Sequence, residues 1–132
     1  KKKPNKPNLR QVHLIHSELH QELALNGFKV NPGEMGENVT TKGIDLLNLP
    51  LNTILKFGDT AIIKITGLRM PCSQLNRIQE GLLNEVIEKA DDGSIMIKAG
   101  VFGVVLQAGP IYVQDKITIT LPQKPFIKLQ SV

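Results

Sequence analysis

Residues 58–67 have the sequence GDTAIIKITG, which predicts a strand that begins after a Gly-Asp turn. Most residues from Thr60 to Thr66 are β-branched, the pattern of a strand that is covered on both faces. Residues 115–122, DKITITLP, again place an aspartate before an Ile/Thr-rich run. Because little helix is expected between the strands, the two units predict a mainly β fold: a largely antiparallel barrel rather than a doubly wound sheet.

The neighbouring segments extend this fold. Residues 9–15, LRQVHLI, alternate in polarity and are rich in β-forming residues, so they predict a strand. Residues 16–27, HSELHQELALNG, predict a short helix with Ser17 as its N-cap and Gly27 as its stop. The prediction is completed by a helical turn before Pro50, helical segments at 73–81 and 82–90, and a strand at 100–109.

Residues 31–43, NPGEMGENVTTKG, break every periodic pattern and predict a long loop. Its backbone N–H groups, the Asn38 amide and the Thr40 and Thr41 hydroxyls are groups that hold phosphates or polar heterocycles. The segment does not match the P-loop pattern, which needs Gly-Lys-Ser/Thr at the start of a helix. A solvated connection is the alternative interpretation of such a loop.

The composition is that of one globular domain. The chain has 132 residues, of which 41% are hydrophobic and 21% charged, near the average for folded proteins. Aromatic residues make up only 4%, which argues against a surface that stacks nucleic-acid bases. Three of the lysines behind the net charge of +4 open the chain, so residues 1–8 are interpreted as a flexible basic leader and residues 9–132 as the domain.

The sequence contains no apolar run of the roughly 18 residues that a membrane span needs. It also contains no secretory signal and no lipidation motif. We therefore expect a cytoplasmic protein that binds neither membranes nor nucleic acid.

Cys72 is the only cysteine, so the chain forms no internal disulfide and no zinc site of several thiolates. Three interpretations remain: an inert buried thiol, a reactive thiol, or one thiolate ligand to a metal held mainly by another group. Pro71 fits the first position of a helix and Arg69 precedes the thiol by three residues, and both features favour the thiolate. Composition alone favours the inert thiol, because free cysteine is among the most buried residue types.

The three histidines, His13, His16 and His20, do not form a zinc-protease motif, because the glutamate does not follow the first histidine of HSELH. His16 and His20 share a helix face, but the sequence shows no third ligand. Capping or surface roles are the preferred interpretation for them, and His13 is expected to be a hydrogen-bonded polar residue on a strand.

Three motifs together resemble the MOSC domain, the family named after the C-terminal domain of molybdenum cofactor sulfurase. They are RQVHLI at 10–15, PGEMGENVTTKGIDLLNLP at 32–50 and GLRMPCSQ at 67–74, in the order and at the spacing of the small stand-alone bacterial members. The resemblance covers about residues 9–122. It implies a MOSC-type barrel of mixed, largely antiparallel strands with a few short peripheral helices.

The resemblance also implies a function. Cys72 aligns with the family cysteine that is proposed to carry a persulfide or to ligate molybdenum in the molybdenum cofactor, molybdopterin. Asn38 and Thr40 match the family's G-E-N-x-T loop, while Arg69 and Gln74 flank the cysteine; with Thr41, these residues are the expected cofactor-binding set. Related proteins reduce N-hydroxylated compounds, and at the level of the whole family pyridoxal phosphate binding is also described.

Two function hypotheses follow from these motifs. The first is a molybdenum-cofactor protein that acts on a small-molecule substrate and depends on a partner protein for electrons or sulfur. The second is a non-catalytic barrel that binds the cofactor or another anionic ligand. An inert structural domain is a third, weaker interpretation.

The sequence departs from the family pattern in three places. The upstream Gly-Asp-x-His strand of stand-alone members is expected to be missing. Asn52 replaces a common glycine, and Met70 replaces a common polar residue beside the thiol.

Overall fold

The computed structural model describes residues 8–132, so the predicted basic leader lies outside the described residues except for Asn8. Eight strands, two α-helices and two 3₁₀ helices are defined in this part of the chain. In chain order they are β1 (Val12–His16), α1 (Ser17–Leu25), β2 (Val39–Thr41), η1 (Leu46–Asn48), β3 (Ile54–Phe57), β4 (Ala61–Leu68), η2 (Ser73–Arg77), α2 (Leu82–Glu85), β5 (Ile87–Lys89), β6 (Ile95–Ile97), β7 (Val101–Gln107) and β8 (Ile117–Thr120).

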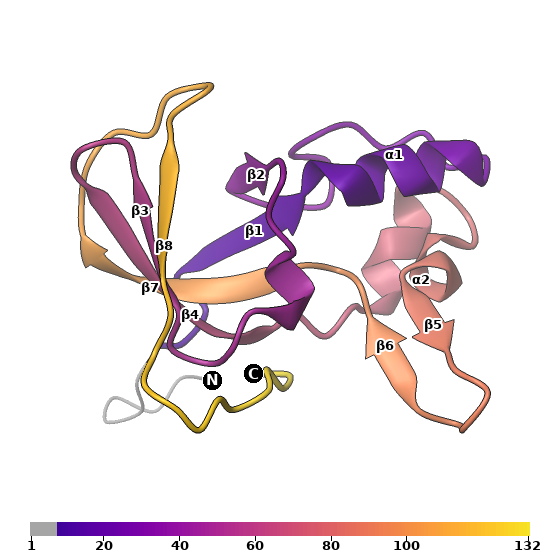
Figure 1. Ribbon diagram of the computed structural model, residues 1–132. Helices are drawn as coiled ribbons and strands as arrows, with labels where there is room; N and C mark the ends of the chain where they lie inside the picture. The colour runs from indigo at the N-terminus through magenta and orange to yellow at the C-terminus, as the bar shows by residue number, and fades with distance from the viewer. Residues whose placement is uncertain (1–7) are drawn as a thin grey trace.

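Six strands form one curled, mixed sheet in the order β2-β1-β7-β4-β3-β8 (Figure 1). The β1–β2 pair is parallel and the other pairs are antiparallel. A separate hairpin of β5 and β6 lies beside α2, away from the β3–β8 end of the sheet. The predicted mainly β fold, a mixed and largely antiparallel barrel-like sheet with short peripheral helices, is confirmed.

Two hydrophobic clusters lie on either side of β1, because its adjacent residues point in opposite directions. Leu14 belongs to the cluster inside the curled sheet, with β3, β4 and Val101. Ile15 belongs to a second cluster with α1, η2 and α2. The segment from Ala99 to Val101 crosses the same boundary, since Ala99 packs in the second cluster and Val101 in the first.

Three sequence predictions were wrong in detail. The loop predicted at 31–43 contains β2, because its Val-Thr-Thr run pairs with β1. The helix predicted at 82–90 ends at Glu85 and is followed by β5. The N-cap position of α1 is His16 rather than Ser17, and the capping position has no side-chain hydrogen bond.

Candidate functional site

The Cys72 segment joins the two clusters. It leaves the end of β4, where Leu68 packs against the sheet cluster, and enters η2, where Leu75 is buried in the second cluster. Between them Pro71 is buried, whereas Met70 and Cys72 are exposed. The thiol is therefore presented at the surface by a segment that is anchored at both ends, which removes the inert buried thiol from the three interpretations.

The helix that follows the thiol is shorter than predicted. η2 spans five residues as a 3₁₀ helix, and Cys72 occupies its N-cap position, so Pro71 precedes the helix instead of opening it. The Leu75 N–H donates to the Cys72 carbonyl at 3.1 Å. That hydrogen bond fixes the backbone of Cys72 and leaves its side chain toward solvent.

Arg69 connects this segment to the glycine-rich loop. Its guanidinium donates to the Met35 carbonyl at 2.7 Å, and its backbone N–H donates to the Gly100 carbonyl at 3.0 Å. Arg69 is half-buried, and Met35 itself is buried in the second cluster. Within residues 8–132 no hydrogen bond joins Arg69 to Cys72, so the expected effect of its charge on the thiol stays a prediction.

Asn38 and His13 hold the other end of the loop on β1. The Asn38 side-chain carbonyl accepts the His13 N–H at 2.8 Å, and the Asn38 N–H donates to the His13 carbonyl at 2.8 Å. The His13 Nε2–H donates to the Ala99 carbonyl at 2.8 Å, so this ring is hydrogen-bonded as expected. Asn38 thus positions the loop through its side-chain oxygen, and its side-chain N–H₂ group is left to donate to a ligand.

Burial favours the neutral form of His13. Burial lowers the pKa of His13 below its ordinary value, and the nearby Arg69 guanidinium lowers it further, against the opposing effects of Ala99 and Glu37. A neutral His13 at pH 7 leaves Arg69 as the cation of this cluster. A guanidinium is a suitable partner for an anionic ligand.

A buried side-chain hydrogen bond fastens the loop to α1. The His20 Nε2–H donates to a Glu37 carboxylate oxygen at 2.8 Å, and the Glu37 side chain is 1% exposed. Burial raises the pKa of Glu37, but hydrogen bonds from Gly33, from its own backbone and from His20 outweigh it and lower the pKa overall. His20 is therefore a buried partner of the loop, and the expected surface role for it was wrong.

Thr40 and Thr41 lie on β2, where their register partners are Ile15 and His16. Thr41 is buried, and within residues 8–132 its hydroxyl has no hydrogen-bond partner. Gln74 is exposed on η2, two residues beyond the thiol. Across the described chain no hydrogen bond joins these three residues to Arg69 or Cys72, so their place in a cofactor site stays a prediction.

The residues that sequence reasoning missed are Met35, Glu37 and Gly100. Glu37 was visible as the centre of the Gly-Glu-Asn motif, but nothing in the sequence shows that it is buried. Gly100 has a φ of +97°, and a Cβ there would lie 2.4 Å from the Leu14 carbonyl oxygen and 2.8 Å from His13 Nε2. Only glycine fits between β1 and the Arg69 backbone at that point.

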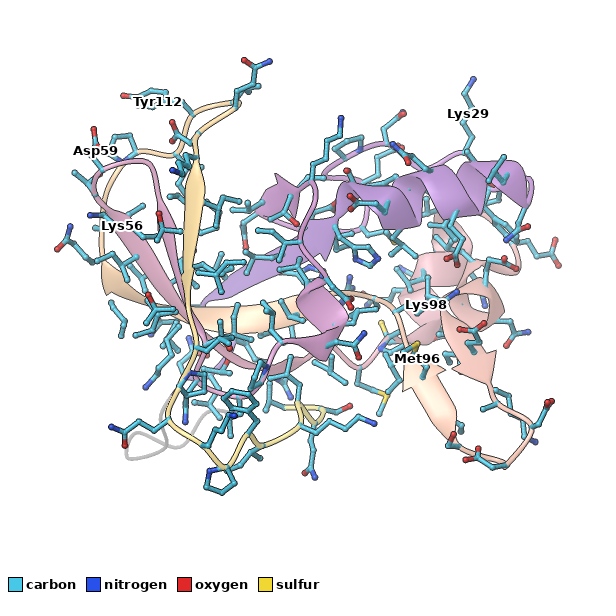
Figure 2. The ribbon with its side chains drawn as sticks, viewed as in Figure 1. Lys29, Lys56, Asp59, Met96, Lys98 and Tyr112 are labelled. Atoms are coloured by element: carbon cyan, nitrogen blue, oxygen red, sulfur yellow. The ribbon has the colours of Figure 1, made fainter. Side chains whose placement is uncertain are left out.

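A cavity of about 370 Å³ opens next to the Arg69 segment. Its wall includes Leu68, Asn48 from η1 and Met96 from β6. Met96 lies in the middle of β6, which forms one side of the cavity, and Lys98 follows the last residue of β6 (Figure 2). One residue of the cavity wall, Leu68, directly precedes Arg69. The wall contains both apolar and hydrogen-bonding side chains.

The model of one protein family matches this chain: the MOSC domain, over residues 5–118. The chain belongs to the MOSC domain family. The match covers the glycine-rich loop, Arg69 and Cys72, so the family resemblance derived from these motifs is confirmed. No curated protein matches the sequence.

Solved structures agree with this MOSC fold. The chain is similar to YiiM from Geobacillus stearothermophilus, with 24% identity and a TM-score of 0.66 over 84% of this chain and 54% of that one. It is also similar to YiiM from Escherichia coli, with 20% identity and a TM-score of 0.66 over 89% and 58%. This MOSC chain therefore spans about half the length of the structures it matches. Among residues 8–132, none of the helices combines the length and apolar character that crossing a bilayer requires.

Proposed function

We propose that this MOSC domain binds the molybdenum cofactor and that Cys72 is the thiolate ligand to molybdenum, in the reduction of N-hydroxylated compounds. The observation that carries the proposal is the position of the chain's single cysteine: exposed, on a segment that Arg69 ties to the glycine-rich loop. A metal that is already chelated by the dithiolene of a pterin needs only one protein thiolate. A persulfide on the same sulfur is the second role that this exposure supports.

The donor groups present fit that cofactor. The Arg69 guanidinium has five N–H groups, and the contact with Met35 uses one nitrogen, so the others are free to pair with a phosphate. The Asn38 amide N–H₂ suits the hydrogen-bonding edge of a pterin. The Thr41 hydroxyl is buried and lacks a partner within the described chain, as a group that awaits a ligand would be.

When bound, the cofactor supplies a two-electron redox centre. Removal of the oxygen of an N-hydroxyl group as water consumes two electrons and two protons, and one cysteine cannot ligate an iron–sulfur cluster. The proposal therefore includes a partner protein that delivers electrons. Cys72 and Met70, which is 57% exposed beside it, form the surface that a substrate meets, with Met70 as its apolar contact.

The test is anaerobic reconstitution with molybdenum cofactor, followed by measurement of molybdenum per chain. Wild type, Cys72→Ser and the neighbouring Ser73→Ala are compared, because both changes are small and both sites are exposed. The proposal predicts close to one molybdenum per chain in wild type and Ser73→Ala, and loss of the metal in Cys72→Ser.

Other outcomes separate the alternatives. If Cys72→Ser retains molybdenum as well as wild type does, the thiolate is not a ligand and the chain is a cofactor-binding module. If wild type retains no molybdenum but releases thiocyanate with cyanide after sulfur loading, Cys72 is a persulfide carrier. If neither occurs, the cofactor proposal is wrong for this chain.

A further inference from the structure

A second cavity lies away from the Cys72 site. It has a volume of about 820 Å³, within the range of roughly 300–1,000 Å³ typical of small-molecule sites. It is found where residues 8–11 and the C-terminal segment 127–132 cross the outer side of β4 and β7. Neither Cys72 nor Arg69 lines it, so a ligand here is distinct from the proposed cofactor.

Hydrogen bonds hold both crossing segments in place. The Thr66 hydroxyl on β4 donates to the Leu9 carbonyl at 2.5 Å, and the Gln11 side chain accepts the Val105 N–H at 2.9 Å. On the other side the Leu68 N–H donates to the Gln130 carbonyl at 2.8 Å. The cavity is therefore bounded by anchored backbone on two sides and by the sheet beneath, and it exists before any ligand arrives.

The wall of the cavity is mainly apolar. Leu51 comes from the turn before β3, Val104 and Val105 from β7, and Ile127 from the C-terminal segment. The Leu51 N–H donates to the Ile127 carbonyl at 2.7 Å, which keeps these two side chains at the same wall. Such a surface favours a hydrocarbon chain, since apolar contact area displaces water.

The charged side chains that line the cavity are both lysines. Lys64 and Lys128 line it, and none of its described lining residues has a carboxylate side chain. Within residues 8–132 the ion pairs are His20–Glu37 and Lys98–Glu22, so neither lining lysine has an acidic partner. Two ammonium groups at an apolar wall are complementary to an anion that carries a hydrocarbon portion.

Asn52 adds a polar group at the same wall. Its φ is +74°, a left-handed conformation that glycine and asparagine tolerate best. Asparagine meets the same backbone demand and in addition places an amide among the residues that line the cavity.

We propose that this cavity binds an amphipathic anion: a molecule with a hydrocarbon chain along the Leu51, Val104 and Ile127 wall and an anionic head group at Lys64 and Lys128. The head group is a carboxylate or a phosphate monoester, which offer the same charge to an ammonium group. Because neither Cys72 nor Arg69 lines this cavity, binding there does not depend on the cofactor.

Isothermal titration calorimetry with decanoate tests the proposal, with decyl phosphate and neutral decanol as probes of equal chain length. Decanoate is expected to bind saturably with one-to-one stoichiometry. Its affinity is expected to be at least about fivefold higher than that of decanol, since one contact between unit charges near water raises the affinity by about this factor. A larger ratio for decyl phosphate than for decanoate identifies the phosphate as the natural head group, and the reverse identifies the carboxylate. Either anion is expected to bind more weakly as salt is raised.

Matched lysine variants locate the site. Lys64→Ala and Lys128→Ala are each expected to weaken decanoate about three- to fivefold and to leave decanol unchanged. Lys56→Ala is the control, because Lys56 is exposed on β3 and does not line the cavity (Figure 2). Val105→Trp, which fills the cavity from a partly exposed position, is expected to abolish saturable binding of all three probes.

The proposal is overturned if decanoate binds no tighter than decanol. It is also overturned if Lys56→Ala weakens decanoate as much as Lys64→Ala does, because the anion then responds to net charge alone. Circular dichroism of each variant confirms that it is folded before titration.

Discussion

Replacement of Gly100 with alanine is expected to lower the free energy of unfolding by about 3 kcal/mol. Two costs add at this position. A φ of +97° is a conformation that side chains disfavour, at about 1–2 kcal/mol for an L-residue in left-handed backbone. The new Cβ would also lie 2.4 Å from the Leu14 carbonyl oxygen, and overpacking of a well-packed site costs about 1–3 kcal/mol.

The backbone of Leu14 has little room to move away. β1 is paired with β2 on one side and with β7 on the other, and Leu14 itself has a partner in both strands. The displacement must therefore pass to the segment after Ala99, whose Gly100 carbonyl accepts the Arg69 N–H. We expect the same variant to disturb the Cys72 segment as well as the overall stability.

Gly93→Ala is the matched control. Gly93 has a φ of +88°, and no atom lies within 4 Å of a Cβ placed there. It therefore measures the backbone cost alone, about 1–2 kcal/mol. Urea unfolding of wild type and both variants at pH 7 gives the two differences; equal losses for Gly100→Ala and Gly93→Ala would refute the close approach of β1 and the Arg69 backbone.

Three further predictions concern the thiol and its surroundings. Because Cys72 is exposed, its rate of reaction with a thiol reagent in the native protein is expected to be within about tenfold of its rate in the unfolded protein. A thousandfold increase in that rate on unfolding would contradict this. Arg69→Ala is expected to lower the free energy of unfolding by about 1–2 kcal/mol, because it leaves the Met35 carbonyl unpaired, and Arg69→Lys is expected to lower it by less. Urea unfolding measures both changes, and equal stability of wild type and the two variants would show that the contact contributes nothing. Because burial lowers the pKa of His13, the stability that its neutral form contributes is present above about pH 6.5 and is lost as the pH falls through its folded pKa. The urea midpoint is expected to fall less from pH 7.5 to pH 5 in His13→Gln than in wild type, and an equal fall in both proteins excludes His13 as a source.

The sequence was sufficient to predict the central strands and their largely antiparallel order. β8 is an unbroken β-branched run, β4 is rich in β-branched residues, and α1 has helical spacing with a glycine just beyond its end. These signals are local, so they survive without knowledge of the partners of each element.

β2 and β5 were missed because each is only three residues long and becomes a strand through its partner. Val39–Thr41 is a short run in a segment crowded with turn residues, and it becomes a strand only because β1 lies alongside. Ile87–Lys89 continues a helical pattern, but it is drawn into the hairpin with β6. Strand pairing overrode the local preference in both cases, through a distant partner for β2 and through a hairpin for β5.

The candidate site was predictable in its residues and not in its contacts. The thiol, Arg69 and Asn38 stand out from the family motifs, yet no local pattern predicts that Arg69 donates to Met35 or that Asn38 holds His13. Burial of Glu37 against His20 is likewise a property of the folded chain. Each of these contacts joins residues at least 17 positions apart, beyond the reach of any local pattern.

The central claim is that Cys72 enables cofactor-dependent reduction of an N-hydroxylated compound. The most direct measurement is the oxidation of a reduced viologen by cofactor-loaded protein on addition of benzamidoxime, under anaerobic conditions, with wild type and Cys72→Ser side by side. The account predicts amidoxime-dependent turnover in wild type and none in Cys72→Ser. Turnover in both proteins, or its absence from wild type that carries molybdenum, would contradict it.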